Sequence, residues 1–186
     1  GEMLGDHRCS HKALFYESAM NIPLCIRPPG GTKAWQSKAL TDQLDLTDTM
    51  LEIADAPYLD NASEYRSSLV SKVLDGPDVA NAQVGKETVF SDVRLYSMAR
   101  NDRYKLAVDS LTREPTELYD MDNDSDQIHN LVEDATLDDV RSELMDHLNT
   151  HLEKLDHDKV KKYQDTLNAN PLLGSAAHRM GTPTVI

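Results

Sequence analysis

Residues able to do chemistry gather in the first twelve positions of the chain. His7, Arg8, Cys9, His11 and Lys12 all come before the first apolar run. Lys12 stands between His11 and an aromatic–apolar stretch, a place where an ammonium could be held against an oxyanion. His7 and His11 could supply protons. By residue type alone, such side chains are more often ordinary surface residues.

No other stretch forms a catalytic or metal-binding pattern by itself. The sequence has no G-x-S-x-G motif, no Gly-rich phosphate loop and no paired Cys/His spacing. Its two cysteines, Cys9 and Cys25, favour neither a zinc site nor a disulfide framework, and we expect Cys25 to be a small core residue. Residues 120–126 resemble a calcium loop, but Ser125 and Leu131 stand where an EF-hand has Gly and Glu, which argues against calcium.

The charge is strongly acidic and unevenly spread. The 186 residues carry a formal net charge of −13, and residues 117–158 contain fourteen Asp or Glu against Arg141 and Lys154. An acidic surface repels nucleic-acid phosphates and anionic membranes, so we expect neither as a partner. An acidic interaction face is the alternative to a plain solvated helix face, which we favour. No apolar run approaches the roughly 20 residues of a membrane span.

Residue patterns in the first half predict short strands and one helix. Residues 22–26 and 38–44 read as strands, and Thr47 would cap a helix over residues 48–54. The apolar side chains of this helix are expected to face inward: Met50, Leu51 and Ile53. A polar stretch over residues 78–85 then marks the expected start of a second part.

The second half predicts an antiparallel meander followed by helices. β-branched and aromatic residues mark three strand segments, 87–99, 104–109 and 116–119, with Pro115 in the last turn. A long helix would begin at Thr136 as its N-cap, and a charged helix would follow over 158–167. One apolar stripe of the long helix would face the sheet: Leu137, Val140, Leu144, Leu148, Leu152 and Leu155.

Two histidines of the long helix lie one turn apart. His147 and His151 have the i, i+4 spacing that can bind zinc, but they lack the HExxH pattern. We therefore interpret them as surface histidines rather than metal ligands.

Several motifs, in the same order, resemble those of the sulfatases of the alkaline phosphatase superfamily. The opening is similar to the stretch after the family's second metal-binding Asp-His pair, through Gly1, Gly5-Asp6-His7, Lys12, Tyr16-Glu17 and Asn21–Arg27. Residues 44–54 resemble the family's Val-Asp-Leu-x-Pro-Thr-Leu-Leu-Asp-Leu-Ala segment. The most specific motifs match its C-terminal signature: Arg100-Asn101-Asp102-Arg103-Tyr104-Lys105-Leu106, Glu117-Leu118-Tyr119-Asp120-Met121 and Asn130-Leu131.

The resemblance, which covers about residues 1–152, implies a fold that runs from α/β to α+β. A remnant of an alkaline-phosphatase-like α/β core would be followed by a small antiparallel sheet packed by a long C-terminal helix. Residues 1–77 would be the C-terminal end of the catalytic core, residues 78–167 the C-terminal subdomain, and residues 168–186 an extended tail.

The resemblance also implies hydrolysis of sulfate esters by the intact parent protein. In the family, a formylglycine made from Cys or Ser attacks the ester, and a divalent, calcium-like cation binds both groups. Neither Cys9 nor Cys25 has the family's Cys/Ser-x-Pro/Ala-x-Arg context, and the metal-binding residues are expected before Gly1. We therefore expect this chain alone to hold no cofactor and to be inactive.

Lys12 is the residue that carries over from the family's active site. It matches the lysine that contacts the sulfate and stabilises charge on the ester in the transition state. His11 and His7 are weaker catalytic candidates, because these positions vary in the family.

Two further hypotheses stay open. The parent could be a phosphonate or phosphate ester hydrolase of the same superfamily, which would share the surroundings of Lys12. Alternatively, the chain is a non-catalytic module that forms homo-oligomers through an exposed sheet edge and apolar faces. The compartment is also open, because this chain does not show the start of the parent and any export signal there.

Overall fold

The computed structural model describes residues 1–12, 14–27, 34–57, 66–70, 85–155 and 157–169. They belong to two units: residues 1–23 together with the chain from Phe90 onward, and residues 24–89. The predicted boundary at residues 77–78 lies outside the described residues and stays a prediction. The same holds for the predicted tail, apart from its first two residues, which belong to a helix.

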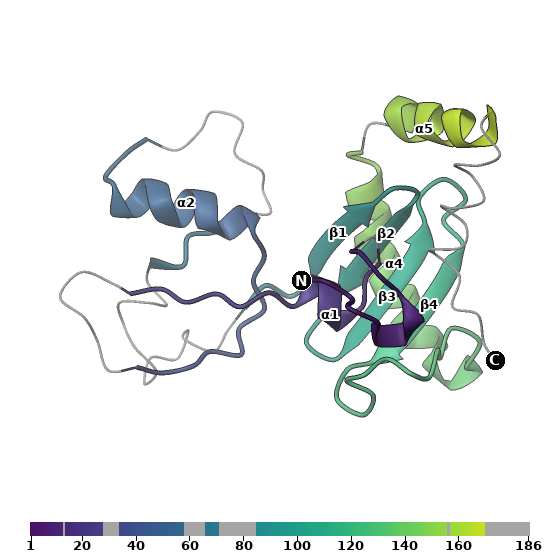
Figure 1. The fold of residues 1–186 in the computed structure, drawn as a ribbon, viewed down its shortest axis with the longest axis horizontal. Coiled ribbons are helices and arrows are strands. Elements are labelled where there is room, and N and C mark those ends of the chain that lie inside the picture. Colours follow the sequence, from purple (N-terminus) through teal and green to yellow (C-terminus); the bar gives the residue numbers. More distant parts are fainter. Residues whose placement is uncertain (13, 28–33, 58–65, 71–84, 156, 170–186) are drawn as a thin grey trace. The chain divides into compact units, whose positions relative to one another are not determined.

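An antiparallel sheet of four strands in the order β1-β2-β3-β4 confirms the predicted meander (Figure 1). The strands are β1 (Val89–Val93), β2 (Tyr96–Arg100), β3 (Tyr104–Asp109) and β4 (Pro115–Asp120). The expected segment 87–99 is two strands, because the chain turns at Arg94, whose φ of 58° lies in the left-handed region. Pro115, expected in a turn, is instead the first residue of β4, a strand position that tolerates a missing N–H.

Helix α4 (Asp138–Leu152) covers one face of this sheet, as Figure 1 shows. Alternation along the strands directs every second side chain to this face, and a leucine stripe along the helix meets it. The buried residues of this apolar cluster are Ala99, Leu106, Val108 and Leu118 of the sheet and Leu144, Leu148 and Leu152 of the helix. The predicted stripe is therefore confirmed.

The start of the long helix differs from the prediction. A short 3-10 helix, η2 (Ala135–Leu137), precedes α4 and is capped by Asp134, which accepts a hydrogen bond from the Thr136 backbone N–H at 2.9 Å. Asp134 is the cap because its carboxylate can reach the backbone N–H two residues further on, which has no partner within the helix. Helix α5 (His157–Ala169) confirms the predicted second helix. Within the described residues, no helix is long and apolar enough to cross a membrane.

The opposite face of the sheet is covered by the N-terminal segment, with η1 (Asp6–Arg8) and α1 (Glu17–Met20) (Figure 1). Two small clusters join this segment to the sheet. One contains Met3, Tyr16, Tyr119 and Met121, and the other contains Phe15, Met98 and Ala107. The first residues of the chain are thus part of the same packed unit as the sheet.

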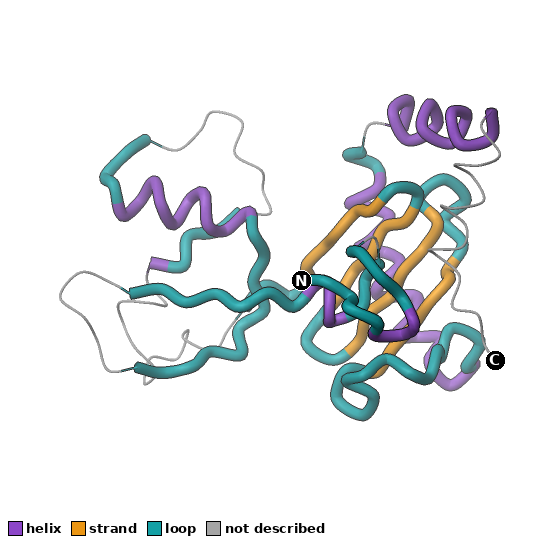
Figure 2. Tube along the Cα trace, in the orientation of Figure 1, coloured by secondary structure: helices purple, strands orange, loops and turns teal. Residues whose placement is uncertain are grey.

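Neither of the two strands predicted near the start is formed. Residues 21–27 and 34–42 are irregular backbone, drawn as loop in Figure 2. A strand exists only as a member of a sheet, and the sheet in the described part of the chain includes neither segment. Cys25, expected in the core, is exposed for the same reason, as are Ile22 and Leu24.

Helix α2 (Leu44–Ile53) begins earlier than predicted and turns the opposite face inward. Its N-cap position is Gln43 rather than Thr47. The buried residues are Asp45, Asp48 and Thr49, whereas Met50 is 63% exposed and Ile53 is 55% exposed. Leu51, the third residue expected to face inward, is partly buried. The prediction was therefore wrong for Met50 and Ile53.

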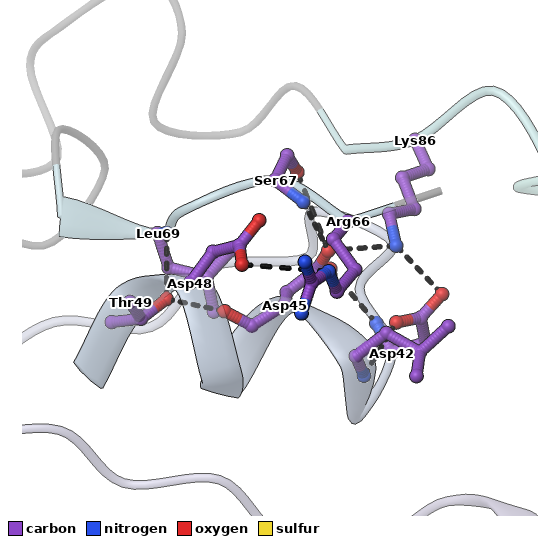
Figure 3. Close-up of polar contacts among 9 residues, drawn as sticks. Asp42, Asp45, Asp48, Thr49, Arg66, Ser67, Leu69 and Lys86 are labelled. Atoms are coloured by element: carbon purple, nitrogen blue, oxygen red, sulfur yellow. Dashed lines mark hydrogen bonds and ion pairs between the residues drawn. The ribbon is translucent and has the colours of Figure 1, made fainter. Parts of the chain in front are cut away.

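Polar contacts with neighbouring segments explain this inversion (Figure 3). The buried Asp45 carboxylate accepts hydrogen bonds from the Ser67 N–H at 2.9 Å and forms an ion pair with Lys86 at 2.7 Å. The Thr49 hydroxyl accepts from the Leu69 N–H at 2.9 Å. These acceptors satisfy backbone N–H groups of a segment that has no strand partner among the described residues.

Candidate functional site

The three predicted site residues lie on the N-terminal segment at the surface of the first unit. Lys12 and His11 are exposed, and His7 is partly buried. The His7 ring stacks on Tyr16 with 3.8 Å between ring centroids. No hydrogen bond or ion pair within the described residues joins Lys12, His11 and His7 to one another. Their catalytic roles therefore stay predictions.

The loop that carries Lys12 has an unusual backbone held by contacts near its two ends. Four of its residues have φ angles between 47° and 69°, a region that residues other than glycine rarely adopt: Leu4, His7, Arg8 and His11. The Met3 N–H donates to the His11 carbonyl at 3.2 Å, and the Glu2 N–H donates to the Ser18 carbonyl at 3.0 Å. Such conformations persist only where the surroundings hold them.

Beneath this loop, the sheet presents a buried polar network. Lys105 of β3 is 2% exposed, and its Nζ donates to the Phe15 carbonyl at 2.8 Å and to Glu17 Oε1 at 2.5 Å. Arg100 of β2 donates to the same carboxylate oxygen at 2.7 Å. Gln127 Oε1 accepts from the Glu17 N–H at 2.8 Å and lies 3.4 Å from Lys105 Nζ.

The network shifts the acidity of its members. Burial by itself would raise the pKa of Glu17, but the charges of Lys105 and Arg100 and the hydrogen bonds that they donate lower it. Burial lowers the pKa of Lys105, and the Glu17 charge opposes this effect. The carboxyl of Glu117, on the same face of the sheet, has its pKa raised to about 7 by burial. Burial also raises the pKa of Tyr16 to about 12.

This network is the part of the site that residue patterns did not reveal. A signal for it was present in β3, where Lys105 shares an inward face with Ala107 two residues on. Its partners come from distant parts of the chain, Glu17 from the N-terminal segment and Gln127 from the loop after β4. Their meeting could be seen only once the chain was folded.

Several polar residues of the C-terminal signature shape turns and the edge of the sheet. The Asn101 side chain accepts from the backbone N–H groups of Arg103 at 3.0 Å and Tyr104 at 2.7 Å, which shapes the turn between β2 and β3. Arg103 then forms a two-pronged pair with Asp120, at 3.1 and 2.7 Å. Asn130 accepts from the Leu118 N–H at 3.0 Å, beside the edge of the sheet.

The acidic run of residues 120–126 is occupied with its own turns. Asp120 binds Arg103 and Asn123, and these hydrogen bonds hold its pKa well below the usual range. Asp124 accepts from the backbone N–H groups of Ile128 and His129. In the described part of the chain, no group of three or more His, Cys, Asp or Glu side chains could hold a metal ion.

His151, interpreted from its sequence as a surface residue, is mostly covered. Its ring stacks on Phe90 with 4.5 Å between centroids, and its Nε2 lies 2.9 Å from Asp92 Oδ2. The helix turns this residue toward β1, which the i, i+4 spacing could not show.

One further stretch of the chain fits the nucleophile pattern of the sulfatases. Residues 175–179 read Ser-Ala-Ala-His-Arg, which fits Cys/Ser-x-Pro/Ala-x-Arg. They lie outside the described residues. The resemblance places the family's nucleophile ahead of the matched motifs, whereas residues 175–179 come after them. We therefore interpret this match as coincidental.

Comparisons with known proteins agree with the resemblance to the sulfatases. The profile of the family described as "N-sulphoglucosamine sulphohydrolase, C-terminal" matches residues 5–154. The sulfatase YidJ of Escherichia coli (strain K12), itself uncharacterized, is 31% identical over 176 residues, which cover 90% of this chain and 33% of YidJ. Arylsulfatase K of Gallus gallus is 29% identical over 140 residues, which cover 70% of this chain and 26% of that protein.

A solved structure has the same fold. A Bacteroides thetaiotaomicron VPI-5482 protein, provisionally named a sulfatase, superposes with a TM-score of 0.66 at 22% identity, over 91% of this chain and 36% of that one. The chain thus spans about a third of the length of YidJ and of this structure, and about a quarter of arylsulfatase K. By the match over residues 5–154, the chain belongs to the C-terminal domain family of the sulfatases named for N-sulphoglucosamine sulphohydrolase.

Proposed function

We propose that this chain is the C-terminal part of a sulfatase-type hydrolase and that the intact protein hydrolyses sulfate esters. The observation that carries the proposal is the family match over residues 5–154, which includes Lys12 and the whole C-terminal signature. In this proposal, the exposed Lys12 ammonium donates hydrogen bonds to the sulfate group and stabilises the charge that develops in the transition state. His11 and His7 are weaker candidates for proton transfer.

The remaining chemistry is assigned to parts of the intact protein that this chain does not match. A formylglycine nucleophile is expected there, and a calcium-like cation, when bound, would act as a Lewis acid toward the sulfate oxygens. The chain alone is then expected to be inactive, because neither group is assigned to its residues.

The test compares this chain with a longer version that includes the preceding part of the sulfatase. Each is supplied with calcium and an aryl sulfate, and turnover is measured. We expect turnover by the longer version alone and a loss of about 10²-fold or more in kcat for Lys12→Ala. Turnover by the short chain would refute its proposed inactivity. The variant Ser175→Ala would then show whether the literal pattern match supplies the nucleophile.

A phosphonate or phosphate ester hydrolase is the alternative within the same superfamily. The longer version is tested on aryl sulfates, phosphonates and phosphate diesters side by side. A higher kcat/KM for a phosphorus substrate would overturn the sulfatase proposal while leaving the role of Lys12 intact.

A second candidate function, as an interaction module, is favoured by the exposed apolar face of α2. Leu44, Met50 and Ile53 are 47%, 63% and 55% exposed. The buried side chains of this helix in the described structure are all polar. Met50 and Ile53 are three residues apart and therefore lie on one side of the helix. Exposed apolar surface of this kind marks an interface. We propose that the isolated chain self-associates through it.

Sedimentation velocity over a range of concentrations tests this second proposal. We expect concentration-dependent association that Met50→Lys removes. Gln43→Lys is the matched control, since it adds the same charge at an exposed position at the start of the same helix. A monodisperse monomer for the unsubstituted chain would exclude self-association.

A further inference from the structure

We propose that Lys105 is a positioning residue for Lys12, acting from the sheet through the segment Phe15–Glu17. This inference rests on the proposed function, in which Lys12 contacts the sulfate ester. Lys105 itself is buried and does not reach the substrate. Its effect would come from holding the loop that carries Lys12.

The contacts of Lys105 use all three N–H groups of its ammonium. They are directed to the Phe15 carbonyl at 2.8 Å, to Glu17 Oε1 at 2.5 Å and to Gln127 Oε1 at 3.4 Å. Two of the three acceptors belong to the segment that follows Lys12, and the third, Gln127, also accepts from the Glu17 N–H at 2.8 Å. One side chain therefore holds both the backbone and a side chain of this segment.

Arg100 fixes the same carboxylate from the neighbouring strand. Arg100 and Lys105 are direct cross-strand partners of β2 and β3, and both donate to Glu17 Oε1. Charge-assisted hydrogen bonds of this kind are short and directional. Two cations on adjacent strands thus define the position of Glu17 relative to the sheet.

Lys12 lies between this anchor and a second one. On its N-terminal side, the His11 carbonyl accepts from the Met3 N–H at 3.2 Å, and Met3 is 2% exposed. His11 has a φ of 69°, a conformation that surrounding contacts must maintain. The Lys12 side chain is exposed, and the described backbone is held at His11 before it and at Phe15 after it, as a residue that must meet a substrate requires.

Stability alone does not explain a charged network at this place. Apolar side chains can cover the same face of a sheet without the desolvation of buried charges, and a buried ion pair adds little net stability compared with them. What the pair adds is a defined geometry. We infer that this geometry serves the reacting end of Lys12.

The experiment measures kcat and KM for an aryl sulfate in the full-length sulfatase that contains this chain. The variants are Lys105→Met, Lys12→Ala and the double variant. We expect Lys105→Met to lower kcat by about 10- to 100-fold, since a misplacement of about 1 Å can cost 10²-fold. In the Lys12→Ala background, Lys105→Met should change kcat by less than about 2-fold, because a positioning residue has nothing left to position.

Leu148→Ala is the matched control for stability. Leu148 is fully buried under the other face of the sheet, in an apolar cluster whose described members include no residue of the N-terminal segment. It should destabilise the protein to a similar degree yet leave kcat unchanged well below the melting temperature. If Lys105→Met does not fold, Glu17→Gln replaces it in the same cycle, because it keeps the size of the side chain and one acceptor oxygen.

Equal slowing by Lys105→Met with and without Lys12 would overturn the inference, as would an unchanged kcat in Lys105→Met. Failure of the proposed function looks different. In that case the unsubstituted protein does not hydrolyse sulfate esters, or Lys12→Ala retains full activity.

Discussion

The two faces of the sheet are covered by the same chain in two different ways. Toward α4, leucines of the helix pack on apolar strand residues such as Leu106 and Leu118. Toward the N-terminal segment, Lys105 and Arg100 bind Glu17, and a few apolar residues surround them. The strands are the same, so the difference lies in which alternate side chains each face presents.

This difference separates stability from position. Apolar burial is strong but non-directional. The α4 face therefore stabilises the unit without depending on the exact distances and angles between individual side chains. Hydrogen bonds and ion pairs between charged groups depend on distance and angle. The polar face therefore fixes where the N-terminal segment lies, and with it the loop that carries Lys12.

The largest expected effect is on the polar face. Lys105→Met leaves Glu17 partly buried beside one remaining cation, and breaking a buried pair in this way costs about 3–5 kcal/mol of unfolding free energy. Urea denaturation followed by circular dichroism measures it. A loss below about 1 kcal/mol would show that the N-terminal segment is held by its apolar contacts instead.

Leu148→Ala tests the apolar face. Removing a fully buried leucine side chain should lower the unfolding free energy by about 3 kcal/mol through lost burial and the cavity left behind. The same urea titration applies. Hydrogen exchange of the N-terminal segment in the folded state should be unchanged, and faster exchange there would contradict the separation of the two faces.

Glu117→Gln probes the charge on the polar face through pH. The folded state raises the pKa of Glu117 to about 7, so folding favours the protonated carboxyl. Stability of the unsubstituted chain should therefore fall as pH rises from about 4.5 through 7, by about 2–3 kcal/mol in total. Glu17 and Asp120 have lowered pKa values and act in the opposite direction only in more acidic solution.

In the variant Glu117→Gln, this decrease of stability with rising pH should disappear. The variant should be more stable than the unsubstituted chain at pH 8 and about equally stable near pH 4. Thermal melts at a series of pH values measure both. An unchanged slope would mean that another group titrates in this range.

The smallest effect is expected at the edge between the two faces. Asn130→Ala removes hydrogen bonds to the Leu118 N–H and the Thr116 carbonyl and should cost about 1 kcal/mol. It also frees backbone groups of β4, which can pair with another chain. In the Met50→Lys background, which removes association through α2, sedimentation should then show weak association that Met50→Lys alone does not show. Its absence would indicate that the Leu131 N–H, which donates to the Leu118 carbonyl at 2.8 Å, still covers the edge.

Much of the sheet and of α4 could be predicted from residue patterns. β3 (Tyr104–Asp109) matches its predicted bounds, and the leucine stripe over residues 144–152 faces the sheet as expected. Both rest on local periodicity, which is a property of neighbouring residues. The family also followed from sequence, because its motifs are short and ordered along the chain.

The errors have one physical cause. Met50 and Ile53 are on the face opposite to the polar stripe, as the period predicts, but only the contacts of Asp45 with Ser67 and Lys86 decide which face is buried. Residues 22–26 have strand-forming composition, but no strand forms without a partner. Periodicity describes a segment by itself, and burial depends on what meets it.

For the candidate site, the sequence by itself determined the family, the order of its motifs and the choice of Lys12 as the residue to test. Only the tertiary structure decided that Lys105, a residue of the C-terminal signature, holds the segment that follows Lys12. The two lysines are far apart in sequence, and a buried cation finds its acceptors through space rather than along the chain.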